Sequence, residues 1–154
     1  MKNSLMANYN IANKFYITGV RRGLGKALKD KMNCVDSLEE CDVFINCKHD
    51  GFTQVELLYA AAALDLKIIN IGSNSPDQNK SKPHVYQIEK SALDKANDQL
   101  FYQGINTTII RFGYFDSPRV KHITNKKMPI EYCVSIIEWV LEQEHRVKEL
   151  TVCP

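Results

Sequence analysis

Apolar residues follow two alternating patterns along this chain. Short apolar or β-branched runs between polar residues are typical of strands that are buried on both faces of a sheet. Apolar residues that recur every three or four positions are typical of helices with one buried face. The runs predict six strands, the second of them very short, at residues 15–17, 33–36, 42–46, 67–71, 106–111 and 149–152. The periodic segments predict four helices, at residues 24–32, 53–64, 86–103 and 129–141.

Strands that alternate with helices predict a parallel sheet covered by helices. We therefore expect an α/β fold, namely a Rossmann-like, three-layer αβα sandwich with a reduced, mostly parallel sheet of about six strands. The length of 154 residues indicates one domain, which we assign to residues 14–154, and the polar residues 1–13 are expected to form a loose arm. In the long helix at residues 86–103, the face expected to be buried contains Ile88, Ala92, Ala96 and Leu100.

The composition is that of an ordinary globular protein, with 44% hydrophobic and 25% charged residues. The formal charge of +2 is too small to indicate nucleic acid or an anionic membrane as a partner. No apolar run is long enough to span a bilayer, and residues 1–13 lack the apolar block of a signal peptide. The five cysteines form no Cys-x-x-Cys pair and no zinc-like cluster with histidine, so we expect no metal site and reduced thiols in a cytoplasmic protein.

A glycine-rich turn follows the first predicted strand. Gly19, Gly23 and Gly25 lie between that strand and a helical pattern that includes Leu24. Strand, glycine turn and helix begin a dinucleotide-binding unit, because glycines let the backbone approach a pyrophosphate and the new helix directs free N–H groups toward it. A flexible turn without a ligand would explain the same residues, so the turn alone does not decide between the two interpretations.

Three features, in order, resemble the short-chain dehydrogenase/reductase family. Residues 18–25 (Thr-Gly-Val-Arg-Arg-Gly-Leu-Gly) match its Thr-Gly-x-x-x-Gly-x-Gly turn. Residues 86–93 (Tyr-Gln-Ile-Glu-Lys-Ser-Ala-Leu) resemble its Tyr-x-x-x-Lys helix, and Ser73 follows a predicted strand thirteen residues before Tyr86. The resemblance implies an NAD(P)(H)-dependent oxidoreductase in which Ser73, Tyr86 and Lys90 are catalytic.

Two further segments resemble parts of that family's cofactor site. Residues 42–46 resemble the strand that leads into its Asn-Asn-Ala-Gly sequence, although Cys47, Lys48 and His49 replace the last three residues. Residues 112–117 are similar to its loop along the nicotinamide. The resemblance implies that the cofactor contacts the following residues: Gly19, Arg21, Arg22, Gly23, Leu24, Gly25, Asp36, Asn46, Cys47, Tyr86, Lys90, Gly113, Phe115 and Ser117.

The resemblance covers essentially residues 14–154 but is interrupted by deletions. Between Val35 and Asp42 there is no room for a helix and a further strand, and the usual substrate-binding loop after Ser117 is short. The family's helix asparagine, part of its proton relay, has no clear counterpart, and Asp50 falls nearest. The strand order implied by the resemblance, with the strands numbered as they occur here, is 2-1-3-4-5-6.

The chemistry of these residue types supports the catalytic assignment. Hydride transfer to a carbonyl leaves an alkoxide that needs a proton, so a general acid must lie beside the carbonyl oxygen. A tyrosine phenol holds its proton tightly at neutral pH, and Lys90, one helical turn after Tyr86, would favour the phenolate. Ser73, at a strand end, could donate a hydrogen bond to the developing oxyanion. The alternative is that Tyr86 is a half-buried helix residue, Lys90 a solvated charge and Ser73 a loop hydroxyl.

Two residues give opposite indications of the cofactor. Arg22, directly before Gly23, could pair bidentately with the 2′-phosphate of NADP(H). Asp36, near the end of the second predicted strand, could accept the free ribose hydroxyls of NAD(H). We expect NADP(H) to be preferred and NAD(H) to be possible, while Arg21 could equally be solvated.

The expected substrate is a small-molecule or carrier-bound carbonyl compound. The short chain leaves little for a lid, so we expect a shallow pocket that suits a carrier-bound or bulky substrate, or a site completed by a neighbouring subunit. A cofactor-binding regulator or scaffold without turnover is the alternative, motivated by the missing asparagine and the missing substrate walls. A nucleic-acid binder that uses Lys80, Lys82, Lys126 and Lys127 is less favoured, because these lysines lack interleaved aromatic residues. By resemblance, we expect a homodimer or homotetramer whose dimer face is formed by residues 53–64 and the helix that carries Tyr86.

Overall fold

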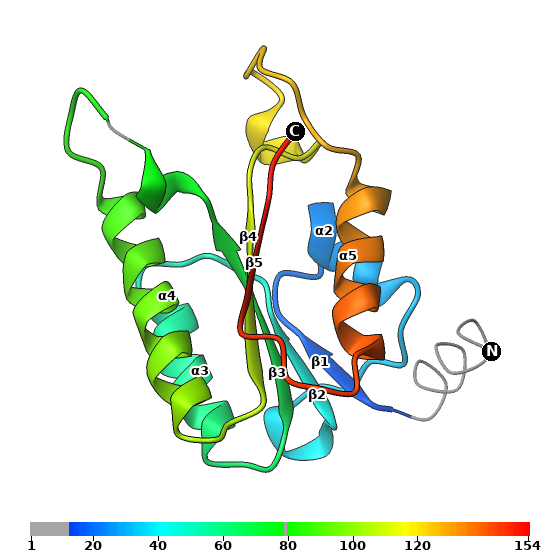
Figure 1. Ribbon diagram of the computed structural model, residues 1–154. Coiled ribbons are helices and arrows are strands. Elements are labelled where there is room, and N and C mark those ends of the chain that lie inside the picture. Colours follow the sequence, from blue (N-terminus) through cyan, green and yellow to red (C-terminus); the bar gives the residue numbers. More distant parts are fainter. Residues whose placement is uncertain (1–12, 79) are drawn as a thin grey trace.

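The computed structural model describes residues 13–78 and 80–154, so nearly all of the predicted arm at residues 1–13 lies outside the described residues. The described chain forms a five-stranded sheet between helices (Figure 1). The strands are β1 (Phe15–Ile17), β2 (Val43–Asn46), β3 (Lys67–Ser73), β4 (Thr107–Phe112) and β5 (Glu149–Val152). The helices are α2 (Gly23–Lys29), α3 (Thr53–Ala62), α4 (Val85–Tyr102) and α5 (Ile130–Glu142), with short 3-10 turns η1 (Leu38–Glu40), η2 (Ser75–Asp77) and η3 (Pro118–Val120).

The strand order is β1-β2-β3-β4-β5, and every neighbouring pair is parallel. β3 lies in the centre, as expected for residues 67–71, and the predicted α/β fold class is confirmed.

The second predicted strand, at residues 33–36, is wrong: only Cys34 pairs, in a single parallel bridge to Phe15. The bridge lies beside β1, where the order 2-1-3-4-5-6 places the second strand. The other five strands follow that order, so the sheet differs from the expectation only in lacking this strand. Asn33 and Asp36 are poor strand formers, and the chain turns into η1 directly afterwards, so no ladder forms.

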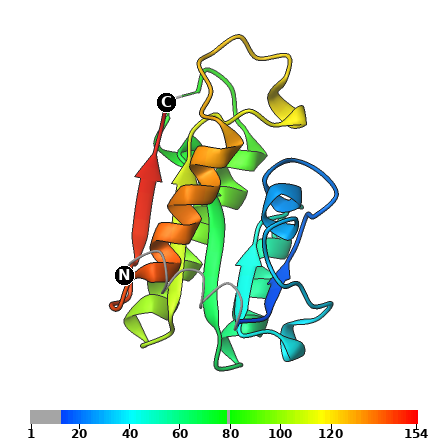
Figure 2. The same ribbon diagram turned by 90° about the vertical axis from the view of Figure 1, so that its right-hand side faces the viewer.

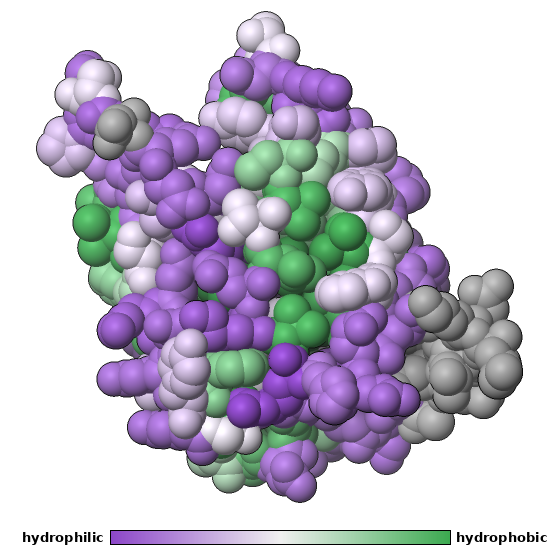
Figure 3. Space-filling view, in the orientation of Figure 1, coloured by the Kyte–Doolittle hydropathy of each residue, from purple (hydrophilic) through white to green (hydrophobic). Residues whose placement is uncertain are grey.

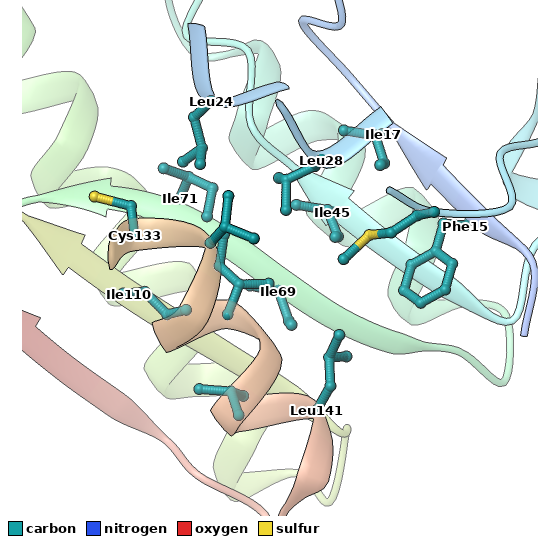
Figure 4. Packing of buried hydrophobic residues seen from close by; sticks show 14 of the residues in the cluster. Phe15, Ile17, Leu24, Leu28, Ile45, Ile69, Ile71, Ile110, Cys133 and Leu141 are labelled. Carbon is teal, nitrogen blue, oxygen red and sulfur yellow. The ribbon is translucent and has the colours of Figure 1, made fainter. Parts of the chain in front are cut away.

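Two helical layers enclose the sheet. α3 and α4 pack together on one face, and α2 and α5 pack together on the other (Figures 1 and 2). Neighbouring residues of a strand point to opposite faces, so in β3 Ile68 belongs to the α3–α4 core and Ile69 to the α2–α5 core. In the α2–α5 core, drawn in Figure 4, Leu28 of α2 and Leu141 of α5 pack with Ile69. This two-sided burial explains why the strands read as uninterrupted apolar runs.

The predicted helices occur where the periodicity placed them, but one expected core residue is wrong. Ile88 is 63% exposed, whereas Ala96 and Leu100 of the same helix are buried as expected. The buried face of α4 begins with Lys90 and continues through Leu93, so the first turns of the helix present a polar side chain to the sheet. Ile88 lies two residues before Lys90, which puts it on the outer side of the helix.

A layer of polar side chains crosses the sheet beneath α3 and α4. The amide nitrogen Nδ2 of Asn46 donates to Asn70 Oδ1 at 3.0 Å, and Asn70 Nδ2 donates to Asn97 Oδ1 at 3.2 Å and Thr107 Oγ1 at 3.0 Å. Gln54 Nε2 donates to the carbonyl oxygen of Asn46 at 2.8 Å. Buried polar groups of this kind must be paired, so the network fixes α3 and α4 against β2, β3 and β4 in one register.

The face of the molecule shown in Figure 3 has an apolar patch over β5 and α5, bordered by hydrophilic surface. β5 is an edge strand, and its Leu150 and Val152 are partly buried against the α2–α5 core. Within the described residues, no helix is long and apolar enough to cross a bilayer.

Candidate active site

The loops that follow β3 and β4 project from the same end of the sheet, at the top of Figure 1. In parallel α/β sheets, ligands bind at the carboxyl ends of the strands. The glycine turn after β1 and the chain after β2 leave the sheet at this end as well, because all strands are parallel. The segments that carry most of the expected residues therefore meet at one edge of the sheet.

The glycine turn has the backbone geometry for which glycine is required. Gly19 and Gly23 have φ angles of +74° and +62°, which are unfavourable for residues with a side chain. A Cβ atom added to Gly25 would overlap the carbonyl oxygen of Gly19, so a side chain at that position would push α2 away from β1. The hydroxyl of Thr18 accepts a hydrogen bond from the N–H of Cys47 at 2.9 Å, which joins the turn to the end of β2.

The other residues expected at the cofactor divide into surface and interior positions. Arg21, Arg22 and Asp36 are exposed. The side chain of Leu24 is buried in the α2–α5 core (Figure 4), so only its backbone could face a ligand. Asn46 is fully buried and belongs to the polar layer.

The loop after β4 approaches the glycine turn. A Cβ atom on Gly23 would lie 3.7 Å from the Cβ of Ser117, so these two expected residues are neighbours. Gly113 and Phe115 line the same cavity as Ser117. Cys47 lies beneath this region, where burial raises the pKa of its thiol to about 11, so it stays protonated at neutral pH.

Ser73 and Tyr86 line one cavity of about 350 Å³ at this edge of the sheet. Ser73 is the last residue of β3, and its Oγ accepts a hydrogen bond from the N–H of Ser75 at 3.0 Å. That contact leaves the hydroxyl hydrogen free to point elsewhere. Tyr86 is half-buried in the first turn of α4. Thus two of the three expected catalytic residues face the same space.

Lys90 lies behind Tyr86, with its Nζ 5.7 Å from the centre of the tyrosine ring. Its Nζ donates to Gln54 Oε1 at 2.8 Å and to the carbonyl oxygen of Ile71 at 3.1 Å. The side chain is buried, and burial lowers the pKa of its ammonium to about 8, with a smaller contribution from the positive charge of Arg119. Lys90 is therefore a positioned, desolvated amine rather than a solvated charge.

Gln54 is a residue that the sequence analysis missed. It lies on the buried face of α3 and accepts the hydrogen bond from Lys90, whereas Asp50, the position nearest the family's asparagine, is exposed. The spacing of Gln54, Leu58 and Ala61, all buried on one helical face, was the available signal. A glutamine among apolar residues on such a face indicates a buried hydrogen-bond network.

Two further residues flank the ring of Tyr86. His49 meets it edge-on, with 4.7 Å between the ring centres, and the guanidinium carbon of Arg119 lies 5.4 Å from the ring centre. His49 Nε2 is 3.5 Å from Glu89 Oε1, and burial, followed by the charges of Lys90 and Arg119, lowers the pKa of the imidazole. His49 occupies one of the positions at which the sequence departs from the family's Asn-Asn-Ala-Gly pattern, so the departure itself pointed to it.

No group of three histidine, cysteine or acidic residues within residues 13–78 and 80–154 is arranged to hold a metal ion. All five cysteines are described, and each has a free thiol.

Comparison of the fold finds several solved oxidoreductase structures. A short-chain dehydrogenase from Burkholderia cenocepacia J2315, in complex with NADP, has 15% identity and a TM-score of 0.65, and the alignment covers 91% of this chain and 87% of that chain. The 3-alpha-hydroxysteroid dehydrogenase from Pseudomonas sp. B-0831, complexed with NADH, has 13% identity, a TM-score of 0.67 and coverage of 91% and 95%. An angucycline C-6 ketoreductase with bound NADP has 12% identity, a TM-score of 0.68 and coverage of 92% and 93%.

Sequence comparison finds neither a matching family model nor a matching curated protein. The likeness to the three structures therefore lies in the fold, and it agrees with the Rossmann-like fold expected from the sequence.

Proposed function

We propose that the chain is a reduced short-chain dehydrogenase/reductase that transfers hydride between NADP(H) and a carbonyl or secondary alcohol. One observation carries this proposal: Ser73 and Tyr86 line the same cavity, and the amine of Lys90 lies 5.7 Å from the Tyr86 ring centre. The solved structures of similar fold hold NADP or NADH, which supports a nicotinamide cofactor here.

The glycine turn fits such a cofactor, because Gly19 and Gly23 adopt the positive φ angles of a tight turn and Gly25 holds α2 close to β1. Gly113, Phe115 and Ser117 would lie along the nicotinamide, and the amine of Lys90 would hold its ribose. When bound, the cofactor supplies or accepts the hydride.

The chain's own residues would manage the proton. Tyr86 gives its phenolic proton to the alkoxide that forms at the carbonyl oxygen. Ser73, whose Oγ accepts from the N–H of Ser75, donates its hydroxyl hydrogen to the same oxygen and stabilises the developing charge. Lys90 favours the phenolate, and its two hydrogen bonds to Gln54 and Ile71 keep its amine in place.

NADPH oxidation in the presence of a panel of aldehydes, ketones and quinones tests the proposal. We expect turnover with at least one compound class. In the absence of substrate, NADPH should bind reversibly. Tight NADPH binding with no oxidation on any compound would favour a regulator or scaffold that binds the cofactor without turnover. Failure to bind either NADPH or NADH would exclude both functions.

The cofactor preference gives a separate prediction. An Arg22→Ala variant should bind NADPH more weakly by about 1–2 kcal/mol and bind NADH nearly as before, because only the pairing with the 2′-phosphate is lost and solvent weakens that pairing at an exposed arginine. Isothermal calorimetry with both cofactors measures the difference, and Lys29→Ala, at the other end of α2, is the control. Equal losses for both cofactors would mean that Arg22 acts on the pyrophosphate or on the fold.

We further propose that two copies associate through α3 and α4. These helices expose Tyr59 and Ile88, which are 44% and 63% accessible, and pairing them would enlarge the small core of a short chain. An Ile88→Glu variant should dissociate the assembly, so light scattering at micromolar concentration should change from a multiple of 17.6 kDa to that mass. Tyr132→Glu, a similarly exposed residue on α5, should leave the α3–α4 contact intact. A wild-type mass of 17.6 kDa would refute the proposal.

A further inference from the structure

The cavity beside Tyr86 is lined by basic and aromatic side chains, and none of the described residues that line it is acidic. Its basic residues come from both projecting loops: Lys80 and His84 follow β3, and Arg119 follows β4. We propose, building on the function proposed above, that the substrate is a small oxo acid whose carboxylate binds Arg119 while its carbonyl faces Ser73 and Tyr86.

Among the described residues, nothing neutralises the charge of Arg119. Within the part of the chain that the structure describes, no carboxylate lies within ion-pair distance of its guanidinium. Its guanidinium carbon is 5.4 Å from the centre of the Tyr86 ring, so it lies within reach of a compound that contacts the tyrosine. A guanidinium binds a carboxylate through two parallel hydrogen bonds, which would orient the substrate as well as attract it.

The nearby Arg111 provides a contrast within the same region. Its Nη1 and Nη2 donate to the two carboxylate oxygens of Asp77 at 2.8 and 2.7 Å, and its Nε lies 3.3 Å from Asp94 and 3.5 Å from Glu149. Three carboxylates therefore neutralise Arg111, which serves the structure. Arg119 has no such partner among the described residues, so its positive charge is available to a ligand.

The other basic side chains add to the same potential. Lys80 Nζ donates to Gln78 Oε1 at 2.9 Å, a neutral amide, and no carboxylate of the described residues forms an ion pair with it. The pKa of Lys90 is lowered chiefly by burial, and repulsion from Arg119 contributes in the same direction. Figure 3 shows that the two projecting loops are largely hydrophilic on the face displayed. An anion at the cavity mouth would be attracted by both loops.

The size of the cavity favours a small compound. About 350 Å³ is near the lower end of ligand pockets, and the nicotinamide would occupy part of it. The aromatic lining residues Phe112, Tyr114 and Phe115 offer apolar surface for the carbon chain between the carbonyl and the carboxylate.

Pairs of oxo acids and their methyl esters test this assignment, because each pair differs in the charge at one end. We name pyruvate, 4-oxopentanoate and benzoylformate, each with its methyl ester. We expect kcat/KM for at least one acid to exceed that of its ester by about two- to fivefold, the gain of an ion pair with an exposed arginine. Arg119→Gln should reduce this acid-to-ester ratio toward one. Lys126→Gln, an exposed lysine of the same loop outside the cavity, should keep the wild-type ratio.

Four outcomes would overturn the assignment. Esters that react as well as their acids would show that charge is not recognised, and turnover of carrier-linked thioesters alone would indicate a different substrate class. If Arg119→Gln weakens NADPH binding and leaves the acid-to-ester ratio unchanged, Arg119 serves the cofactor. If no compound is turned over, the proposed function fails, but the role of Arg119 can still be tested by binding. Saturation-transfer NMR should then show that the acids bind the wild type better than Arg119→Gln. If they do not, the assignment is wrong.

Discussion

A Tyr86→Phe variant should lose turnover by a factor of about 10²–10⁴ and keep its affinity for NADPH. The change removes one oxygen atom and keeps the ring, so the edge-on contact with His49 and the position beside Arg119 are preserved. Only the proton donor for the alkoxide is lost. Steady-state rates with any active carbonyl compound, together with NADPH titration, measure both quantities.

Tyr102→Phe is the matched control, because it removes a phenolic hydroxyl from the last residue of the same helix, far from the cavity. Its rate should equal that of the wild type. If Tyr86→Phe also turns over at the wild-type rate, Tyr86 is not the acid, and the chemistry would have to be reassigned. If the wild type itself has no turnover and both variants bind NADPH equally, a cofactor-binding regulator explains the site better.

A Lys90→Met variant should lower both turnover and NADPH affinity, in contrast to Tyr86→Phe. Methionine has a similar volume but no charge, so Tyr86 would lose the ammonium that favours its phenolate, and the nicotinamide ribose would lose a donor. The variant also leaves Gln54 Oε1 without its buried donor, which should cost about 1–3 kcal/mol of stability. Thermal unfolding must therefore be measured alongside the kinetics.

The pH dependence of the wild type provides a second readout of Lys90. Burial lowers the pKa of its amine to about 8, so the amine is charged below that pH and neutral above it. We expect kcat/KM to decline as the pH rises through about 8, and this decline should be absent in Lys90→Met. Lys95→Met, on the exposed side of the same helix, should keep the wild-type profile. If kcat/KM declines at high pH in Lys90→Met as it does in Lys95→Met, the decline does not arise from the amine of Lys90.

The sequence was sufficient for most of the fold because the sheet is buried on both faces. Runs such as residues 67–71 are typical of central strands in a covered sheet, and the structure agrees. The prediction of a strand at residues 33–36 was wrong. Whether so short a segment pairs at a sheet edge depends on where the following chain goes, and here it turns into η1 at once. The local sequence pattern does not report this. The prediction that Ile88 is buried was wrong for a related reason. The helix turns Lys90 toward the sheet instead, and the spacing of apolar residues cannot indicate that a polar residue is buried.

The candidate site was predicted less completely than the fold. The sequence identified Ser73 and Tyr86, which the structure brings to one cavity, because both are set by their distance from a strand end. It did not predict the contacts that His49, Gln54 and Arg119 make with Tyr86 and Lys90, since these contacts join separate elements. Such contacts arise only when α3, α4 and the loop after β4 are assembled around the sheet.

A crystal structure with bound NADPH tests the central proposal most directly. We predict the pyrophosphate against the glycine turn at Gly19, the ribose hydroxyls of the nicotinamide half at Lys90, and the nicotinamide ring in the cavity that Ser73 and Tyr86 line. A nicotinamide ring outside that cavity, or a cofactor bound away from the glycine turn, would contradict the assignment of this site to hydride transfer.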